Sequence, residues 1–263
     1  AELRAEVCRA ANALPGLGVE PGTKVAIYMP MIPETVVAML ALAKLGAVVI
    51  PIFSGYAAPA VASRLADCAA TALMTADGFY RRGKPVAMKR VADEAAATVP
   101  GLKTVVVVRR AGIDAPWTPG RDVWWHDLTA SGAPAFETLR TSPEDPYMII
   151  YTSGTTGRPK GAVHVHAGFP VKGAQDLAHC FDVQAGDVLF WLTDIGWMMG
   201  PWAISGALML GATLLLYDGT PDYPGPDRLW ALAARHGVTV LGIAPTAVRA
   251  LKTHGPEPVR KHD

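Results

Sequence analysis

The sequence has few cysteines and no excess of charge of either sign. Its 263 residues include only three cysteines, Cys8, Cys68 and Cys180, far apart in the chain, with no CxxC spacing and no histidine cluster beside them. This pattern argues against a disulfide framework and a structural zinc site, and it fits a reducing, cytoplasmic compartment. The 24 lysines and arginines nearly balance 23 aspartates and glutamates, which leaves a net charge of +1. Because the chain has no long run of cations, binding to a nucleic acid is disfavoured.

A membrane-spanning segment is also lacking. The most apolar stretch, Val36 to Phe53, carries Lys44, Gly46 and Pro51, and it is better interpreted as helix, turn and buried strand. No membrane partner is therefore expected. The chain starts without an initiator methionine or a signal-peptide pattern, and its tail from Lys252 is polar and interrupted by prolines, so we expect a piece of a longer protein. With 51% hydrophobic residues the chain has enough apolar surface to form a core.

Short apolar runs rich in β-branched residues alternate with longer helical patterns. Strands are expected at residues 24–29, 47–52, 72–75, 104–108, 147–151, 161–164, 188–191, 212–216 and 239–243, and helices at 33–45, 58–69, 88–96, 202–210 and 227–236. Strands that are apolar on both faces and separated by helices predict an α/β fold with largely parallel sheets covered by helices on both faces. Prolines, glycines and polar residues make 111–146 look mostly irregular. We therefore expect a first α/β subdomain at 1–110, an irregular connection at 111–146 and a second α/β subdomain at 147–263.

Candidate chemistry is concentrated in the loop that directly follows the expected strand at 147–151. The loop reads Thr152, Ser153, Gly154, Thr155, Thr156, Gly157, Arg158, Pro159, Lys160, Gly161. Its glycines allow backbone N–H groups to approach a phosphate, its hydroxyls add neutral donors and Lys160 adds a positive charge, so the loop suits a polyphosphate. It is not a Walker A loop, because Pro159 stands where GxxxxGK[ST] requires glycine. The alternative is a flexible surface loop of turn-forming residues, which its position directly after a buried strand disfavours.

Four smaller groups of residues do not point to one role when taken alone. The run that holds Asp194, Gly196, Trp197, Met198, Met199 and Gly200 is apolar and glycine-spaced, a pattern that is more often core than pocket. The basic cluster of Arg81, Arg82 and Lys84 is most often a solvated turn when taken alone. His164 and His166 are interpreted as packing or hydrogen-bonding residues, because no third ligand has suitable spacing, and no protein-bound metal is expected. Pro245 and Thr246 are interpreted as a helix start.

The segment YTSGTTGRPKGAVHVH, Tyr151 to His166, resembles the phosphate-loop motif of the adenylate-forming (ANL, AMP-binding) superfamily. This superfamily contains acyl-CoA synthetases, adenylation domains of peptide synthetases and luciferases. Segments 51–68, 75–86, 193–202 and 223–251 are similar to the acetyl-CoA synthetase branch in particular, so the resemblance covers nearly the whole chain. Family members are about twice as long. The resemblance thus implies a fragment that comprises much of the large N-terminal domain.

The function that this resemblance implies is that of an ATP-dependent, AMP-forming, short-chain acyl-CoA synthetase. Such an enzyme joins a small carboxylic acid to Mg2+-bound ATP, releases pyrophosphate, and passes the acyl group from the adenylate to coenzyme A. Several functional elements of the family come later than the motifs matched here, past Asp263. They are a glutamate that binds magnesium, an aspartate that binds ribose, a hinge, and a lysine of the mobile C-terminal domain. The resemblance therefore implies activity for the full-length parent and not for the isolated fragment.

The resemblance also implies roles for individual residues. Binding of the β- and γ-phosphates falls on Thr152, Ser153, Gly154, Thr155, Thr156, Gly157 and Lys160, of which Thr155, Thr156 and Lys160 are the expected catalytic residues. The acyl pocket is expected at Trp197, Met198, Met199 and Gly200. Coenzyme A is expected to place its adenine along Gly55 and Tyr56 and its 3′-phosphate at Arg81 and Lys84.

The resemblance is compatible with more than one acid and more than one class of function. Acetyl-specific relatives have small or branched residues where Met198 and Met199 stand, whereas acetoacetyl-CoA synthetases have a similar GWMM, so the resemblance does not imply strict acetate specificity. An adenylation domain that loads a carrier protein is one alternative, which the basic segment Arg81 to Lys84 disfavours. A nonenzymatic nucleotide-binding or regulatory remnant is another.

Overall fold

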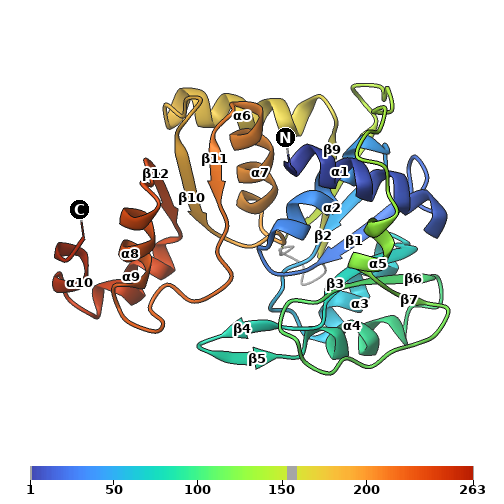
Figure 1. Cartoon of the computed structure of the whole chain (residues 1–263), viewed down its shortest axis with the longest axis horizontal. Coiled ribbons are helices and arrows are strands. Elements are labelled where there is room, and N and C mark those ends of the chain that lie inside the picture. Colours follow the sequence, from blue (N-terminus) through green and yellow to red (C-terminus); the bar gives the residue numbers. More distant parts are fainter. Residues whose placement is uncertain (1, 153–158, 263) are drawn as a thin grey trace.

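The computed structural model describes residues 2–152 and 159–262 and contains two separate β-sheets and one small hairpin (Figure 1). The strands are β1 (Lys24–Tyr28), β2 (Val48–Pro51), β3 (Ala72–Ala76), β4 (Phe79–Arg81), β5 (Lys84–Val86), β6 (Thr104–Val108), β7 (Asp122–Trp124), β8 (Pro146–Thr152), β9 (Lys160–Val165), β10 (Val188–Leu192), β11 (Thr213–Leu215) and β12 (Val240–Ile243). The helices are α1 (Glu2–Ala13), α2 (Pro33–Lys44), α3 (Ala58–Asp67), α4 (Met88–Ala96), α5 (Trp125–Ala130), α6 (Gly168–Cys180), α7 (Met199–Met209), α8 (Arg228–Arg235), α9 (Pro245–Lys252) and α10 (Glu257–Arg260). A 3-10 turn at Leu14–Leu17 follows α1.

The larger sheet has seven strands in the order β7-β6-β3-β1-β2-β8-β9. All of its pairs are parallel except β8 with β9. Every residue of β2 and β3 is buried, which explains why these strands are apolar on both faces. The crossovers through α2 and α3 run in opposite directions along the sheet, and their right-handedness places the two helices on opposite faces.

The smaller sheet has three parallel strands in the order β11-β10-β12. Its crossovers through α7 and α8 also run in opposite directions, so helices cover both of its faces. The expected α/β class with largely parallel sheets is therefore confirmed. Among the described residues, every helix is too short or too polar to span a bilayer.

The stretch 111–146 is less irregular than expected. It contains β7, which forms an edge of the larger sheet by pairing with β6, and α5, which packs against α1. A three-residue strand and a six-residue helix are too short for their periodicity to be recognised in a sequence. Helix α6 was not predicted either, because Gly168, Pro170 and Gly173 are residues that usually disfavour a helix. The close approach of the two helices depends instead on Gly206 of α7, because a Cβ there would collide with the backbone of Gly173.

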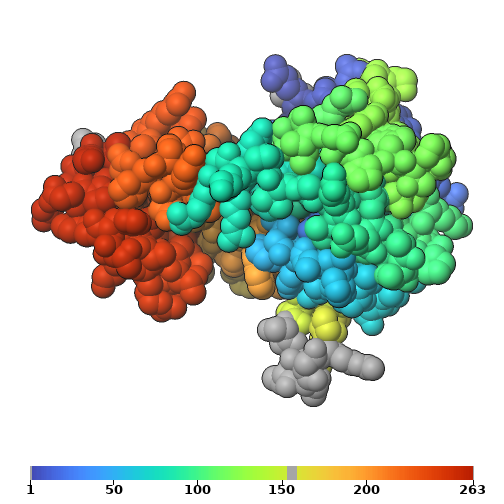
Figure 2. All heavy atoms as spheres, turned by 90° about the horizontal axis from the view of Figure 1, so that it is seen from below, coloured from blue at the N-terminus to red at the C-terminus, as the bar shows by residue number. Residues whose placement is uncertain are grey.

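The change from one sheet to the other does not coincide with the boundary expected at residue 146. Strands β8 and β9 pair with β2 and with each other, so they extend the larger sheet, and the smaller sheet begins only with β10. The hairpin β4–β5 extends from the part of the chain that forms the larger sheet to the C-terminal part that contains the smaller sheet. Figure 2 shows this teal segment reaching towards the orange and red C-terminal part, and Arg82 at its tip pairs with Asp222 over 2.7 Å.

Candidate functional site

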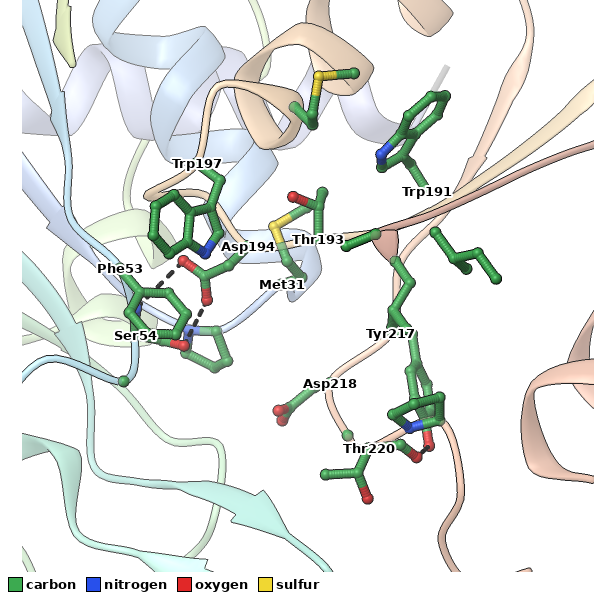
Figure 3. A pocket seen from close by; sticks show the side chains of 18 of the residues that line it. Met31, Phe53, Ser54, Trp191, Thr193, Asp194, Trp197, Tyr217, Asp218 and Thr220 are labelled. Atoms are coloured by element: carbon green, nitrogen blue, oxygen red, sulfur yellow. Dashed lines mark hydrogen bonds between the residues drawn. The ribbon is translucent and has the colours of Figure 1, made fainter. Parts of the chain in front are cut away.

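A pocket of about 730 Å³ opens where the carboxyl ends of strands from the two sheets meet (Figure 3). The loop after β1 contributes Pro30 and Met31, the turn after β2 contributes Phe53, Ser54 and Gly55, and hairpin strand β4 contributes Phe79, Tyr80 and Arg81. The smaller sheet contributes residues 191–194, Trp197, Met199, residues 217–221 and residues 243–246. The crevice outside the carboxyl ends of parallel strands is the usual ligand site of α/β folds. The volume suits a small organic ligand or part of a larger one.

Two of the four expected acyl-pocket residues line this pocket. Trp197 is 49% exposed and its ring lies 5.2 Å from that of Phe53, while Met199 begins helix α7. Met198 does not line the pocket, and neither does the buried Gly200. A Cβ on Gly200 would collide with the backbone of Asp194, so this glycine allows α7 to start directly against the turn that carries Trp197.

The expected coenzyme A residues are divided between the pocket and its surroundings. Gly55 and Arg81 line the pocket, whereas Tyr56 and Lys84 do not. The hydroxyl of Tyr56 accepts a hydrogen bond from Arg64 Nη2 over 3.2 Å, and the Arg64 guanidinium lies 4.2 Å from the centre of the Tyr56 ring. Lys84 is the direct cross-strand partner of Arg81 in the β4–β5 hairpin.

The expected phosphate loop lies mostly outside the described residues. Ser153, Gly154, Thr155, Thr156 and Gly157 belong to that part. Its two described flanks, Thr152 at the end of β8 and Lys160 at the start of β9, are cross-strand partners in the antiparallel pair at the edge of the larger sheet. Both are exposed, and neither lines the 730 Å³ pocket.

Two carboxylates that the sequence analysis did not assign to the site line the pocket. Asp194 is 8% exposed, and burial raises its pKa to about 6. Asp218 accepts a hydrogen bond from Arg110 over 3.0 Å, and burial raises its pKa as well. Each residue follows the end of a strand in the smaller sheet, which is the signal that singles out such positions.

The charges around the pocket are locally compensated. Asp194 accepts hydrogen bonds from Ser54 and Gly196, and Asp218 pairs with Arg110. Among the described residues that line the pocket, Arg81 is the one cation. An anionic ligand would therefore meet one free positive charge and two carboxylates whose charge is already engaged.

The two histidines after the loop serve as packing residues. The ring of His164 lies 5.0 Å from Phe169, and that of His166 lies 5.3 Å from Tyr147, both edge to face. Burial lowers the pKa of both imidazoles. The residues that the structure describes contain no group of three side chains able to hold a metal ion.

Comparison with known proteins adds relatives that match along the whole chain. The family model described as "AMP-binding enzyme" matches residues 1–263. Acetyl-coenzyme A synthetase of Streptomyces avermitilis is 46% identical over 265 residues, which cover 100% of this chain and 41% of that protein. Acetyl-coenzyme A synthetase of Methanothrix thermoacetophila is 44% identical over 263 residues, covering 100% of this chain and 40% of that protein.

A solved structure has the same fold. The acetoacetyl-CoA synthetase from Streptomyces lividans matches with a TM-score of 0.90 and 37% identity, covering 100% of this chain and 40% of that one. The present chain therefore spans about 40% of the length of the relatives it matches.

Proposed function

Because the chain belongs to the AMP-binding enzyme family, we propose that it is the N-terminal part of an ATP-dependent, AMP-forming acyl-CoA synthetase that acts on short carboxylic acids. The observation that carries this proposal is the pocket at the carboxyl ends of two sheets, bordered by a hairpin with two neighbouring cations. Carrier-protein loading is the alternative, and the hairpin cations favour coenzyme A.

The first step is formation of an acyl-adenylate. The carboxylate oxygen of the acid attacks the α-phosphorus of ATP, the bond to the β-phosphate oxygen breaks, and pyrophosphate leaves. The exposed Lys160, the first residue of β9 and the neighbour of the loop that joins β8 to β9, is suited to stabilise the negative charge that accumulates on the leaving group. No protein nucleophile is required.

The acid is accommodated beside Trp197 and Met199. Both side chains line the pocket, Trp197 from the turn after β10 and Met199 from the start of α7, so they form one wall. The methionine thioether is flexible and can adapt to chains of different length. We therefore favour a preference for short acids in general over strict specificity for acetate.

In the second step the thiol of coenzyme A attacks the acyl carbon and AMP leaves. Arg81 and Lys84 are directly opposed in a two-stranded hairpin, an arrangement that is destabilising for like charges unless an anion lies between them. The neighbouring cation Arg82 is engaged by Asp222 and the nearby Arg110 by Asp218. Arg81 and Lys84 thus suit the dianionic 3′-phosphate of coenzyme A.

Magnesium would accompany the nucleotide. The phosphates of ATP would hold the ion, together with the glutamate that the family resemblance implies past Asp263. The residues that the structure describes contain no cluster of three acidic, histidine or cysteine ligands, and no step is routed through a protein-bound metal. The described groups that fit the nucleotide are the hydroxyl of Thr152 and the ammonium of Lys160.

The test uses the full-length parent protein. Acid-dependent exchange of labelled pyrophosphate into ATP reports the first step, and thioester formation on coenzyme A or on a carrier thiol reports the second. Exchange together with coenzyme A thioester supports the proposal. Exchange with transfer only to a carrier supports the alternative, and absence of exchange with every short acid contradicts both.

A further inference from the structure

One carboxylate of the pocket lining links a turn of the smaller sheet to a turn of the larger sheet. Asp194 Oδ1 accepts hydrogen bonds from the backbone N–H of Gly196 over 2.8 Å and from that of Ser54 over 3.2 Å, and Oδ2 accepts one from the Ser54 hydroxyl. Figure 3 shows the two bonds to Ser54 as dashed lines. Ser54 follows β2 of the larger sheet, whereas Asp194 and Gly196 follow β10 of the smaller sheet.

The two turns also interlock through their backbones and rings. A Cβ on Gly196 would collide with the backbone nitrogen of Phe53, so the turns are as close as backbone atoms allow. The Phe53 ring in turn contacts Trp197 at 5.2 Å and Tyr56 at 5.3 Å between ring centres. A shift of one turn relative to the other would therefore move Trp197 and the segment at Gly55 and Tyr56.

Burial of the Asp194 carboxylate costs solvation free energy. Asp194 is 8% exposed, and no cation among the described residues forms an ion pair with it. A buried carboxylate without a cation is stabilised by the hydrogen bonds that it accepts, and the same bonds hold the donors in place.

We propose that Asp194 is a positioning residue, which fixes the turn that carries Trp197 against the turn that carries Gly55. The inference rests on the function proposed above, in which Trp197 borders the acyl group and Gly55 borders coenzyme A. By holding the two turns together, Asp194 sets the distance between the acyl carbon and the attacking thiol.

The experiment compares three variants of the full-length parent. Asp194→Ala removes all three accepted bonds, whereas Asp194→Asn retains two acceptor contacts and can donate to the Ser54 hydroxyl. Ser205→Ala is the matched control, because it also removes a buried hydroxyl contact, to Tyr147 over 3.4 Å, away from the pocket. The KM values for acid, coenzyme A and ATP are measured, together with hydrogen–deuterium exchange of peptides covering 50–57 and 192–199.

The expected result is a selective effect. For Asp194→Ala we expect the KM values for acid and coenzyme A to rise about tenfold or more, since a misplacement of about 1 Å can cost about 100-fold. The KM for ATP should stay within about threefold of wild type, and Asp194→Asn should restore acid and coenzyme A binding. Deuterium uptake should rise in both turn peptides of Asp194→Ala and in neither peptide of Ser205→Ala.

Failure of the inference and failure of the proposed function give different results. Unchanged uptake in the two turn peptides, or a KM for ATP that rises as much as the others, overturns the positioning role. An Asp194→Asn variant as impaired as the alanine variant also overturns it, because charge and not geometry would then be decisive. Absence of pyrophosphate exchange in the wild-type parent contradicts the proposed function, while the uptake comparison still decides whether Asp194 holds the turns. If Asp194→Ala does not fold, Ser54→Ala takes its place, because it removes the hydroxyl bond to Asp194 alone. A smaller rise in the KM values for acid and coenzyme A then supports the inference, and unchanged KM values overturn it.

Discussion

The ammonium of Lys89 lies 2.8 Å from the carboxylate of Asp122, and both side chains are fully buried. Lys89 also pairs with Asp93 over 2.6 Å, and Arg121 bonds to both carboxylates. Burial alone would raise the pKa of Asp122, but the hydrogen bonds from Arg121 and Lys89 outweigh this effect, so the pKa lies below its ordinary value. The network ties α4, the helix that follows the β4–β5 hairpin, to the edge strand β7.

Loss of Lys89 should destabilise the protein strongly. Lys89→Ala leaves the Asp122 carboxylate buried without its ammonium partner, and breaking a buried ion pair in this way typically costs about 3 to 5 kcal/mol. Urea unfolding of variant and wild type measures the difference. Lys172→Ala, which breaks the exposed pair between Lys172 and Asp176, is the control and should have little effect. A similar stability for the two variants would contradict the role of the network.

Lys160 should be required for adenylation. Lys160→Ala in the full-length parent should lower the rate of acid-dependent pyrophosphate exchange by about 100-fold to 1,000-fold, as loss of one preorganised charge stabiliser does. Lys103→Ala, at an exposed position before β6, serves as the control for removal of a surface charge. Exchange at the wild-type rate in the Lys160 variant would exclude the assigned role.

Charge reversal on the hairpin should affect the second step only. Arg81→Glu combined with Lys84→Glu should raise the KM for coenzyme A while pyrophosphate exchange stays nearly unchanged, because the two steps use different surfaces. Arg82→Gln is a matched control on the same hairpin, since its guanidinium is engaged by Asp222. If exchange fell as much as thioester formation, the cations of the hairpin would be structural.

The residue at position 199 should influence the choice of acid. Pockets with an apolar wall separate chains that differ by one methylene by about 1 to 3 kcal/mol, so we expect preferences of no more than roughly 200-fold between neighbouring acids. Met199→Thr should change the ranking of acetate, propionate, butyrate and acetoacetate more than it changes the KM for ATP. Met209→Thr, at the exposed far end of α7, should leave the ranking intact. An unchanged ranking in Met199→Thr removes this residue from the acyl pocket.

Asp194 should make stability depend on pH in a direction opposite to that of an ordinary paired carboxylate. Its pKa is raised from 3.8 to about 6, so between these values the folded state binds a proton that the unfolded state has lost. Its contribution to stability therefore falls as pH rises from 4 to 6 and stays constant above. Relative to Asp194→Asn, the wild type should gain about 2 kcal/mol between pH 7 and pH 4. Urea titrations of both proteins at several pH values measure this, and a pH-independent difference would contradict the raised pKa.

Most of the elements follow from the sequence because their signals are local. The strand at Thr104–Val108 and the helix at Met88–Ala96 lie where β-branched residues and helical spacing predict them. Hairpin β4–β5, helix α1 and the elements within 111–146 were not predicted. Their stability comes from distant partners, such as Asp77, whose carboxylate accepts backbone hydrogen bonds from Gly78 and from four residues at 110–113 and so anchors the start of the hairpin.

The sequence by itself determined the α/β class, the position of the glycine-rich and hydroxyl-rich loop, and the family resemblance, because each of these depends on residues that are neighbours in the chain. Only the tertiary structure decided that β8 and β9 extend the first sheet, that Trp197 and Met199 face the pocket while Met198 does not, and that Asp194 bonds to Ser54. Ser54 and Asp194 are 140 positions apart, and only the parallel topology brings the carboxyl ends of their strands together. Contacts of this kind depend on how the two sheets pack, which no local pattern encodes.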